Sequence, residues 1–217
     1  MEWSSAFADW LFMAATVQNL ETICVSTISA EDVEHVERLL TAAGPSLRRL
    51  EIGVASRRAT RRKNKRVSEW EGDAGTYPRL VHNASLSSLC LFLDTRSDWI
   101  PGLLSQINSP SVRDITVQLP RLRKPGQMKH IRFDALDSIL SQPQFDGVHR
   151  LVVECDGGVG TPAQMDAYTA EVSTRLPLSC ARRIVSVRPR KVSVTSAPKP
   201  VLRKSRLKQS RNCGTRG

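Results

Sequence analysis

One apolar spacing recurs along the chain and limits its fold more than any other feature. An apolar residue is followed by a second apolar residue three positions later and by a third five positions later. The five segments with this spacing are Leu20-Ile23-Val25, Leu47-Leu50-Ile52, Leu86-Leu89-Leu91, Val112-Ile115-Val117 and Val148-Leu151-Val153. Within each segment the last two apolar residues lie on one face of an extended strand. The sequence therefore predicts five short strands that bury one face.

Helical patterns separate these segments. Apolar residues at helical spacing predict helices within 33–40, 99–107, 133–140 and 161–176, and a further helix over 1–18 that covers the first strand. Ser29 is expected to cap the 33–40 helix, because the acidic residues Glu31 and Asp32 follow within three positions. Residues 182–187 are a weaker sixth strand. Strands joined by helical crossovers must run parallel.

Together these patterns are typical of leucine-rich repeats, whose units of about 26 residues each contribute one strand and one helix or turn. The predicted fold is α/β: a short, irregular leucine-rich-repeat-like solenoid over residues 1–187, with parallel strands on the inner face and helices outside. A basic loop is inserted at about 55–82, and a disordered basic tail occupies 188–217. The repeat consensus places Asn or Cys three residues after the last apolar position. Here those positions are Ile28, Ala55, Asp94, Pro120 and Asp156, so we expect the ladder of side-chain hydrogen bonds to be missing or improvised.

The cysteines and the termini exclude several classes of protein. The five cysteines include no C-x-x-C pair, so we expect neither a metal nor a cofactor. Cys24, Cys90 and Cys155 lie in or beside predicted strands and are expected to be reduced and buried. No membrane-spanning stretch and no clear signal peptide are present, which predicts a cytoplasmic or nuclear protein.

The net charge of +11 comes from two basic segments, residues 57–66 and 188–217, neither of which contains an acid. The residues of the first that could contact an anion or a nucleic acid are Arg57, Arg58, Arg61, Arg62, Lys63, Lys65 and Arg66. A nuclear localisation signal and a solvated loop are the other interpretations of this run.

Alternation along the strands selects the residues that would face a partner. In each predicted strand the residue before the last apolar position points away from the core. These residues are Cys24, Glu51, Cys90, Thr116 and Val152. Because this row is nearly uncharged, we expect a mixed or apolar contact surface there.

Two other sequence features could belong to a catalytic or a phosphate-binding site. Asp134 and Asp137 share a helix face, but a solvated or helix-dipole position explains them better than acid–base catalysis. The glycines at 157–160 lack the spacing of a phosphate-binding loop and predict a flexible connector. We therefore expect no enzymatic activity.

Four segments carry a resemblance to a known family: AGPSLRRLEI at 43–52, NASLSSL at 83–89, IPGLLSQINSP at 100–110 and FDALDSILS at 133–141. They resemble the leucine-rich-repeat-like region of F-box-like proteins from basidiomycete fungi, over roughly residues 8–187. The resemblance implies the substrate-recognition part of an adaptor for a cullin-type ubiquitin ligase, with a protein partner. The F-box itself, which binds the ligase core in that family, is not found, so we expect a shortened chain or a protein that works without it.

Three hypotheses follow from the sequence. The first is a non-catalytic protein-interaction scaffold of this ligase class. The alternative is a nucleic-acid-associated protein that binds through 57–66 and 188–217. The third is a fragment without a stable fold, which would lack a cooperative thermal transition.

Overall fold

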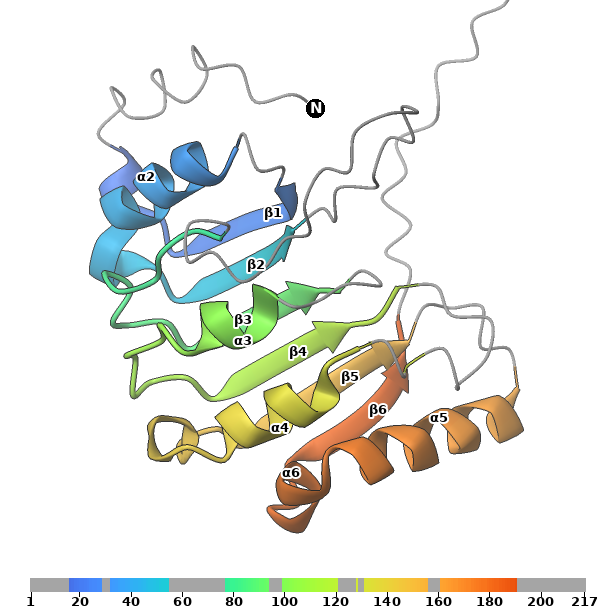
Figure 1. Cartoon of the computed structure of the whole chain (residues 1–217). Helices are drawn as coiled ribbons and strands as arrows, with labels where there is room; N and C mark the ends of the chain where they lie inside the picture. The colour runs from blue at the N-terminus through green and yellow to red at the C-terminus, as the bar shows by residue number, and fades with distance from the viewer. Residues whose placement is uncertain are drawn as a thin grey trace, which may run out of the picture.

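Strands and helices alternate along the chain in the computed structural model (Figure 1), which describes residues 16–28, 32–54, 77–93, 99–120, 128, 131–155 and 161–190. The strands are β1 (Thr22–Ile28), β2 (Arg49–Val54), β3 (Ser88–Phe92), β4 (Asp114–Gln118), β5 (Arg150–Cys155) and β6 (Val185–Pro189). The α-helices are α2 (Val33–Ala43), α3 (Trp99–Leu104), α4 (Phe133–Leu140), α5 (Pro162–Arg175) and α6 (Pro177–Ala181). Short 3-10 helices are η1 (Thr16–Asn19), η2 (Gly44–Ser46) and η4 (Pro143–Phe145).

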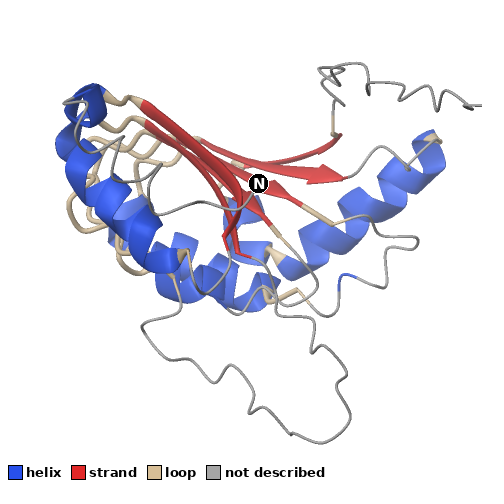
Figure 2. Ribbon diagram, turned by 90° about the horizontal axis from the view of Figure 1, so that it is seen from above, coloured by secondary structure: helices blue, strands red, loops and turns tan. Residues whose placement is uncertain are grey.

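The six strands form one sheet in the order β1-β2-β3-β4-β5-β6, and every neighbouring pair is parallel. Each strand therefore pairs with the next strand along the chain. Figure 2 shows the helices on one side of this sheet only. The opposite side carries no helix or strand among the described residues, and it is called the open face below.

Two rows of apolar side chains fix the register of the central strands. Leu50, Leu89, Ile115 and Leu151 form one row, and Ile52, Leu91, Val117 and Val153 form the other. All eight side chains are fully buried between the sheet and the helices. Burying each contributes roughly 1.5–3 kcal/mol. A slip of one residue would move a whole row to the open face, so the register is strongly specified.

The predicted strands are confirmed, including the sixth, but each begins later than its apolar pattern. Leu47, Leu86, Val112 and Val148 are the first apolar residues of four segments, and all are buried in the turns that precede β2 to β5. The side chain enters the core from the turn, and the strand itself begins two residues later. The pattern therefore marks the turn together with the strand.

The predicted helices over 33–40, 99–107, 133–140 and 161–176 are confirmed as α2, α3, α4 and α5. Thr161 caps α5 in a capping box with Gln164. The expected cap at Ser29 is wrong, because α2 begins at Val33 after Asp32. Helix α6 was not predicted. Of the helix expected over 1–18, the described part is η1.

Most of the loop expected at about 55–82 and the tail beyond Arg190 lie outside the described residues. The described end of the loop joins the core. Leu80 is buried, and the half-buried Tyr77 packs against α3 beside Gly102, where a Cβ atom would overlap the tyrosine ring. Strand β6 runs through Pro189, into the segment expected as tail.

Side-chain hydrogen bonds link successive units just before the strands. Asn83 Nδ2 donates to the carbonyls of Leu40 and Gly44, at 2.9 and 3.0 Å. Ser109 Oγ donates to the carbonyls of Ala84 and Leu86, at 2.7 and 2.8 Å. Both residues precede a strand, whereas the repeat consensus places such a residue after the strand. Of the consensus positions, Ala55, Asp94 and Asp156 lie outside the described residues.

Candidate functional site

The open face is the candidate site, because it is a broad surface of the sheet that the described helices leave uncovered (Figure 2). Three rows of residues in register build it. The first row is Thr22, Arg49, Ser88, Asp114 and Arg150; the second is Cys24, Glu51, Cys90, Thr116, Val152 and Ser186; the third is Gly53, Phe92, Gln118, Glu154 and Arg188.

The second row contains the five residues that the sequence selected. The structure brings Cys24, Glu51, Cys90, Thr116 and Val152 side by side across five strands, each paired in register with the next. Cys90 and Val152 are buried, whereas Glu51 and Thr116 are partly exposed. The expectation that Cys24 is buried is wrong. Cys24 is exposed, because its neighbours Ile23 and Val25 occupy the core side of β1 and its own side chain lies on the other side.

The charged residues of the face lie mainly in the rows beside the predicted one. Arg150 Nε donates to Asp114 Oδ1 at 2.8 Å, across β4 and β5. Arg188 donates through Nε and Nη2 to Glu154 Oε1, at 2.9 and 2.6 Å, across β5 and β6. Such pairs hold neighbouring strands together. The sequence alone did not predict these ion pairs, because the strand register decides which charged residues meet.

Glu51 is the centre of a third cluster, on β1 and β2. Arg49 donates through Nε and Nη2 to Glu51 Oε1, at 2.9 and 2.7 Å. The thiol of Cys24 donates to Glu51 Oε2 at 3.2 Å. Burial opposes ionisation of Glu51, but these hydrogen bonds outweigh it and lower the pKa of the carboxyl below its usual value.

The thiols on and behind this face are held protonated. Burial, together with the hydrogen bond to Glu51, raises the pKa of Cys24 to about 11. Burial and the charge of Glu51 raise the pKa of Cys90 to about 12, and burial raises that of Cys155 to about 11. Since the thiolate is the nucleophile and metal-binding form, these cysteines are weakly reactive at neutral pH.

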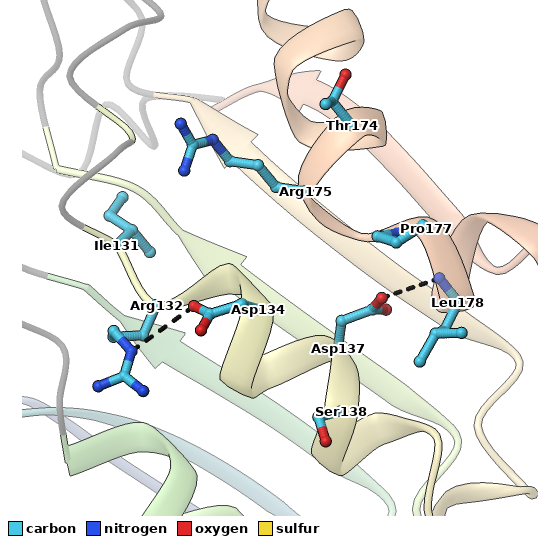
Figure 3. A pocket seen from close by; sticks show the side chains of 9 residues that line it. All are labelled: Ile131, Arg132, Asp134, Asp137, Ser138, Thr174, Arg175, Pro177 and Leu178. Carbon is cyan, nitrogen blue, oxygen red and sulfur yellow. Dashed lines mark hydrogen bonds and ion pairs between the residues drawn. The ribbon is translucent and has the colours of Figure 1, made fainter.

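A cleft between α4 and the α5–α6 turn is the other hollow of interest (Figure 3), with a volume of about 640 Å³. It contains both aspartates that the sequence singled out. Asp134 is exposed, as expected for a solvated residue, and its Oδ1 lies 3.6 Å from Arg132 Nε. Asp137 is 3% exposed, so it is not solvated, and it takes a helix-dipole position at the start of α6 instead.

Asp137 is buried because it caps α6. Its Oδ2 accepts from the Leu178 backbone N–H at 2.9 Å, and its Oδ1 accepts from the Ser179 N–H and hydroxyl at 2.8 and 2.6 Å. On the other wall of the cleft Arg175 pairs with Glu171 at 2.7 Å. Asp137 thus joins α4 to α6, whereas the Arg175–Glu171 pair lies within α5.

The remaining sequence predictions concern basic residues, metals and membranes. Arg57, Arg58, Arg61, Arg62, Lys63, Lys65 and Arg66 all lie outside the described residues. The described part of the chain holds no group of three His, Cys, Asp or Glu side chains arranged to bind a metal. It also holds no helix with the length and apolar character that crossing a membrane requires.

Comparisons with protein-family models, with curated proteins and with solved structures find no match to this chain.

Proposed function

We propose that the chain is a non-catalytic protein-interaction scaffold that binds a protein partner on the open face. In this proposal the strand–helix units form a short leucine-rich-repeat-like solenoid. The chain supplies the substrate-recognition part of an F-box-like ubiquitin-ligase adaptor. Its ligase role rests on the sequence resemblance, and its binding role rests on the sheet.

One observation carries the binding role. Six parallel strands in chain order have the described helices on one side, so a broad face of mixed polar, charged and apolar residues lies on the other. In a sheet of this size both faces are normally covered by helices when the sheet is entirely parallel. A sheet face that no helix or strand of the described residues covers favours occupation by another molecule.

Thr116→Arg tests this role. Thr116 is the partly exposed residue between Cys90 and Val152, near the middle of the face, and an arginine there would fill the contact surface while reaching solvent. The matched control is Ser173→Arg on the exposed side of α5. Proteins cross-linked in cells to the full wild-type chain and to both variants are quantified by mass spectrometry.

We expect a set of partners that Thr116→Arg loses at least tenfold and Ser173→Arg retains, with both variants melting near the wild-type temperature. Identical sets of captured proteins would refute a role for the open face. The ligase role adds a second expectation. When the protein is depleted from cells, the partners that Thr116→Arg loses should carry less ubiquitin and become more abundant.

Nucleic-acid association through the basic segments is the alternative function. It predicts binding that falls steeply with salt and disappears when residues 57–66 and the tail are deleted. The tail deletion should begin at Lys191, because Arg188 and Pro189 belong to β6 and Arg190 N–H donates to the Cys155 carbonyl. Binding that survives both deletions supports the open face instead.

A further inference from the structure

In the ion pairs of the open face, the arginine side chains are more exposed than the carboxylates that they bind. The Arg49 side chain is 55% exposed and its partner Glu51 is 21% exposed. The Arg188 side chain is 50% exposed and its partner Glu154 is 11% exposed. A molecule that approaches this face therefore meets guanidinium groups first.

These guanidinium groups keep donors for a further acceptor. Arg49 uses Nε and Nη2 on Glu51, and Arg150 uses only Nε on Asp114, so each retains a terminal nitrogen without an acceptor among the described residues. Arg190 has no carboxylate partner among those residues, and its Cζ lies 5.9 Å from the centre of the Phe92 ring. Arginine holds a planar array of donors that suits carboxylates.

We propose that the open face binds an extended, acidic segment of a partner protein, whose carboxylates contact the outward arginines. This inference rests on the proposed function and adds the chemistry of the partner. Arg49 and Arg150 lie in one row, in register through Ser88 and Asp114. They are thus three strand spacings apart, or about 14 Å.

That separation fixes the spacing of acids in the partner. An extended chain rises about 3.3 Å per residue, and residues four apart lie on the same side of it. A segment lying across the strands, with Asp or Glu at positions i and i+4, can therefore reach both arginines. The residue between them at i+2 also faces the sheet, above the middle of the row.

Charge decides between this occupant and two others. The chain's own segment 191–217 contains lysines and arginines and no acid, so the outward arginines repel it. A nucleic acid would meet the three carboxylates of the face, Glu51, Asp114 and Glu154, which limit its attraction for a continuous polyanion. A short segment with isolated acids fits this alternation of charge.

Selection from a library of random displayed dodecapeptides against the full chain tests the proposal. The expected winners carry two acidic residues four positions apart, and they fail to bind Arg49→Glu, which reverses one of the charges that they contact. Arg49→Gln and Arg150→Gln should each weaken binding of the best peptide about tenfold, because each removes one charge-assisted hydrogen bond. Arg175→Gln, which changes an arginine on the helix side, is the matched control and should bind as the wild type does.

The possible failures are distinct. Winners that are neutral or basic, but that fail to bind Thr116→Arg, would overturn the acidic partner and leave the proposed function standing. An absence of any winner sensitive to either Thr116→Arg or Arg49→Glu would overturn both. An oligothymidine strand that displaces the winning peptide and itself requires Thr116 would overturn the peptide in favour of a nucleic acid.

Discussion

Replacing Asp137 with alanine should destabilise the protein far more than replacing Asp134, although both aspartates are on α4. Asp137 is buried and accepts three hydrogen bonds at the start of α6, including two from Ser179. Its loss leaves the buried Ser179 N–H without an acceptor, which costs about 1–3 kcal/mol, and removes a favourable charge at the helix start. We therefore expect Asp137→Ala to lower the free energy of unfolding by about 3 kcal/mol.

Urea denaturation followed by circular dichroism measures this change, and the melting temperature should fall by roughly 6–12 °C. Asp134→Ala is the control. Its side chain is 77% exposed and its ion pair with Arg132 is 3.6 Å long, so we expect a loss below about 0.5 kcal/mol. Asp137→Asn keeps an acceptor oxygen but loses the charge, and should cost about 1 kcal/mol. An Asp137→Ala variant as stable as Asp134→Ala would refute the capping role.

Four further changes test other parts of the structure by the same unfolding measurement. Gly102→Ala should cost about 1–3 kcal/mol because its Cβ overlaps Tyr77, and far less in a Tyr77→Ala background. Arg183→Gly should stabilise by about 0.5–1 kcal/mol, since Arg183 has a φ of 58°, which glycine adopts without strain. Burial raises the pKa of the Cys90 thiol from 9.0 to about 12. Above pH 9 this thiol therefore ionises in the unfolded state before it does in the folded state, so the free energy of unfolding should fall as the pH rises. The fall should be less steep in Cys90→Ala, which lacks the thiol. Asn83→Asp should cost more than Asn83→Ala, because a carboxylate would face two carbonyl oxygens instead of donating to them.

The sheet could be predicted from the sequence because its information is local. Each strand needs only apolar residues two positions apart, and each crossover needs one helical stripe. Residues such as Leu50 and Ile52 satisfy this rule and are buried as expected. The same alternation placed Thr116 and Glu51 correctly on the side away from the helices, since it follows from strand geometry alone.

The features that the sequence did not predict depend on partners distant along the chain. Helix α6 has five residues and no apolar stripe of its own, and its cap is supplied by Asp137, more than forty residues earlier. The charge of the open face was missed for the same reason. Glu154 meets Arg188 only because β5 and β6 pair in one particular register.

Long-range side-chain bonds also explain how units with poor consensus turns hold together. Asn83 and Ser109 donate to main-chain carbonyls of the preceding unit, and Arg182 donates to the carbonyls of Leu140 and Phe145, at 2.6 and 2.9 Å. Opening one unit therefore strips donors from the carbonyls of its neighbour, which adds to the loss of shared apolar contacts. Coupling of this kind favours one cooperative unfolding transition over the stepwise loss of strand–helix segments. The open face gains from this coupling, because its rows keep their register only while all six strands remain paired.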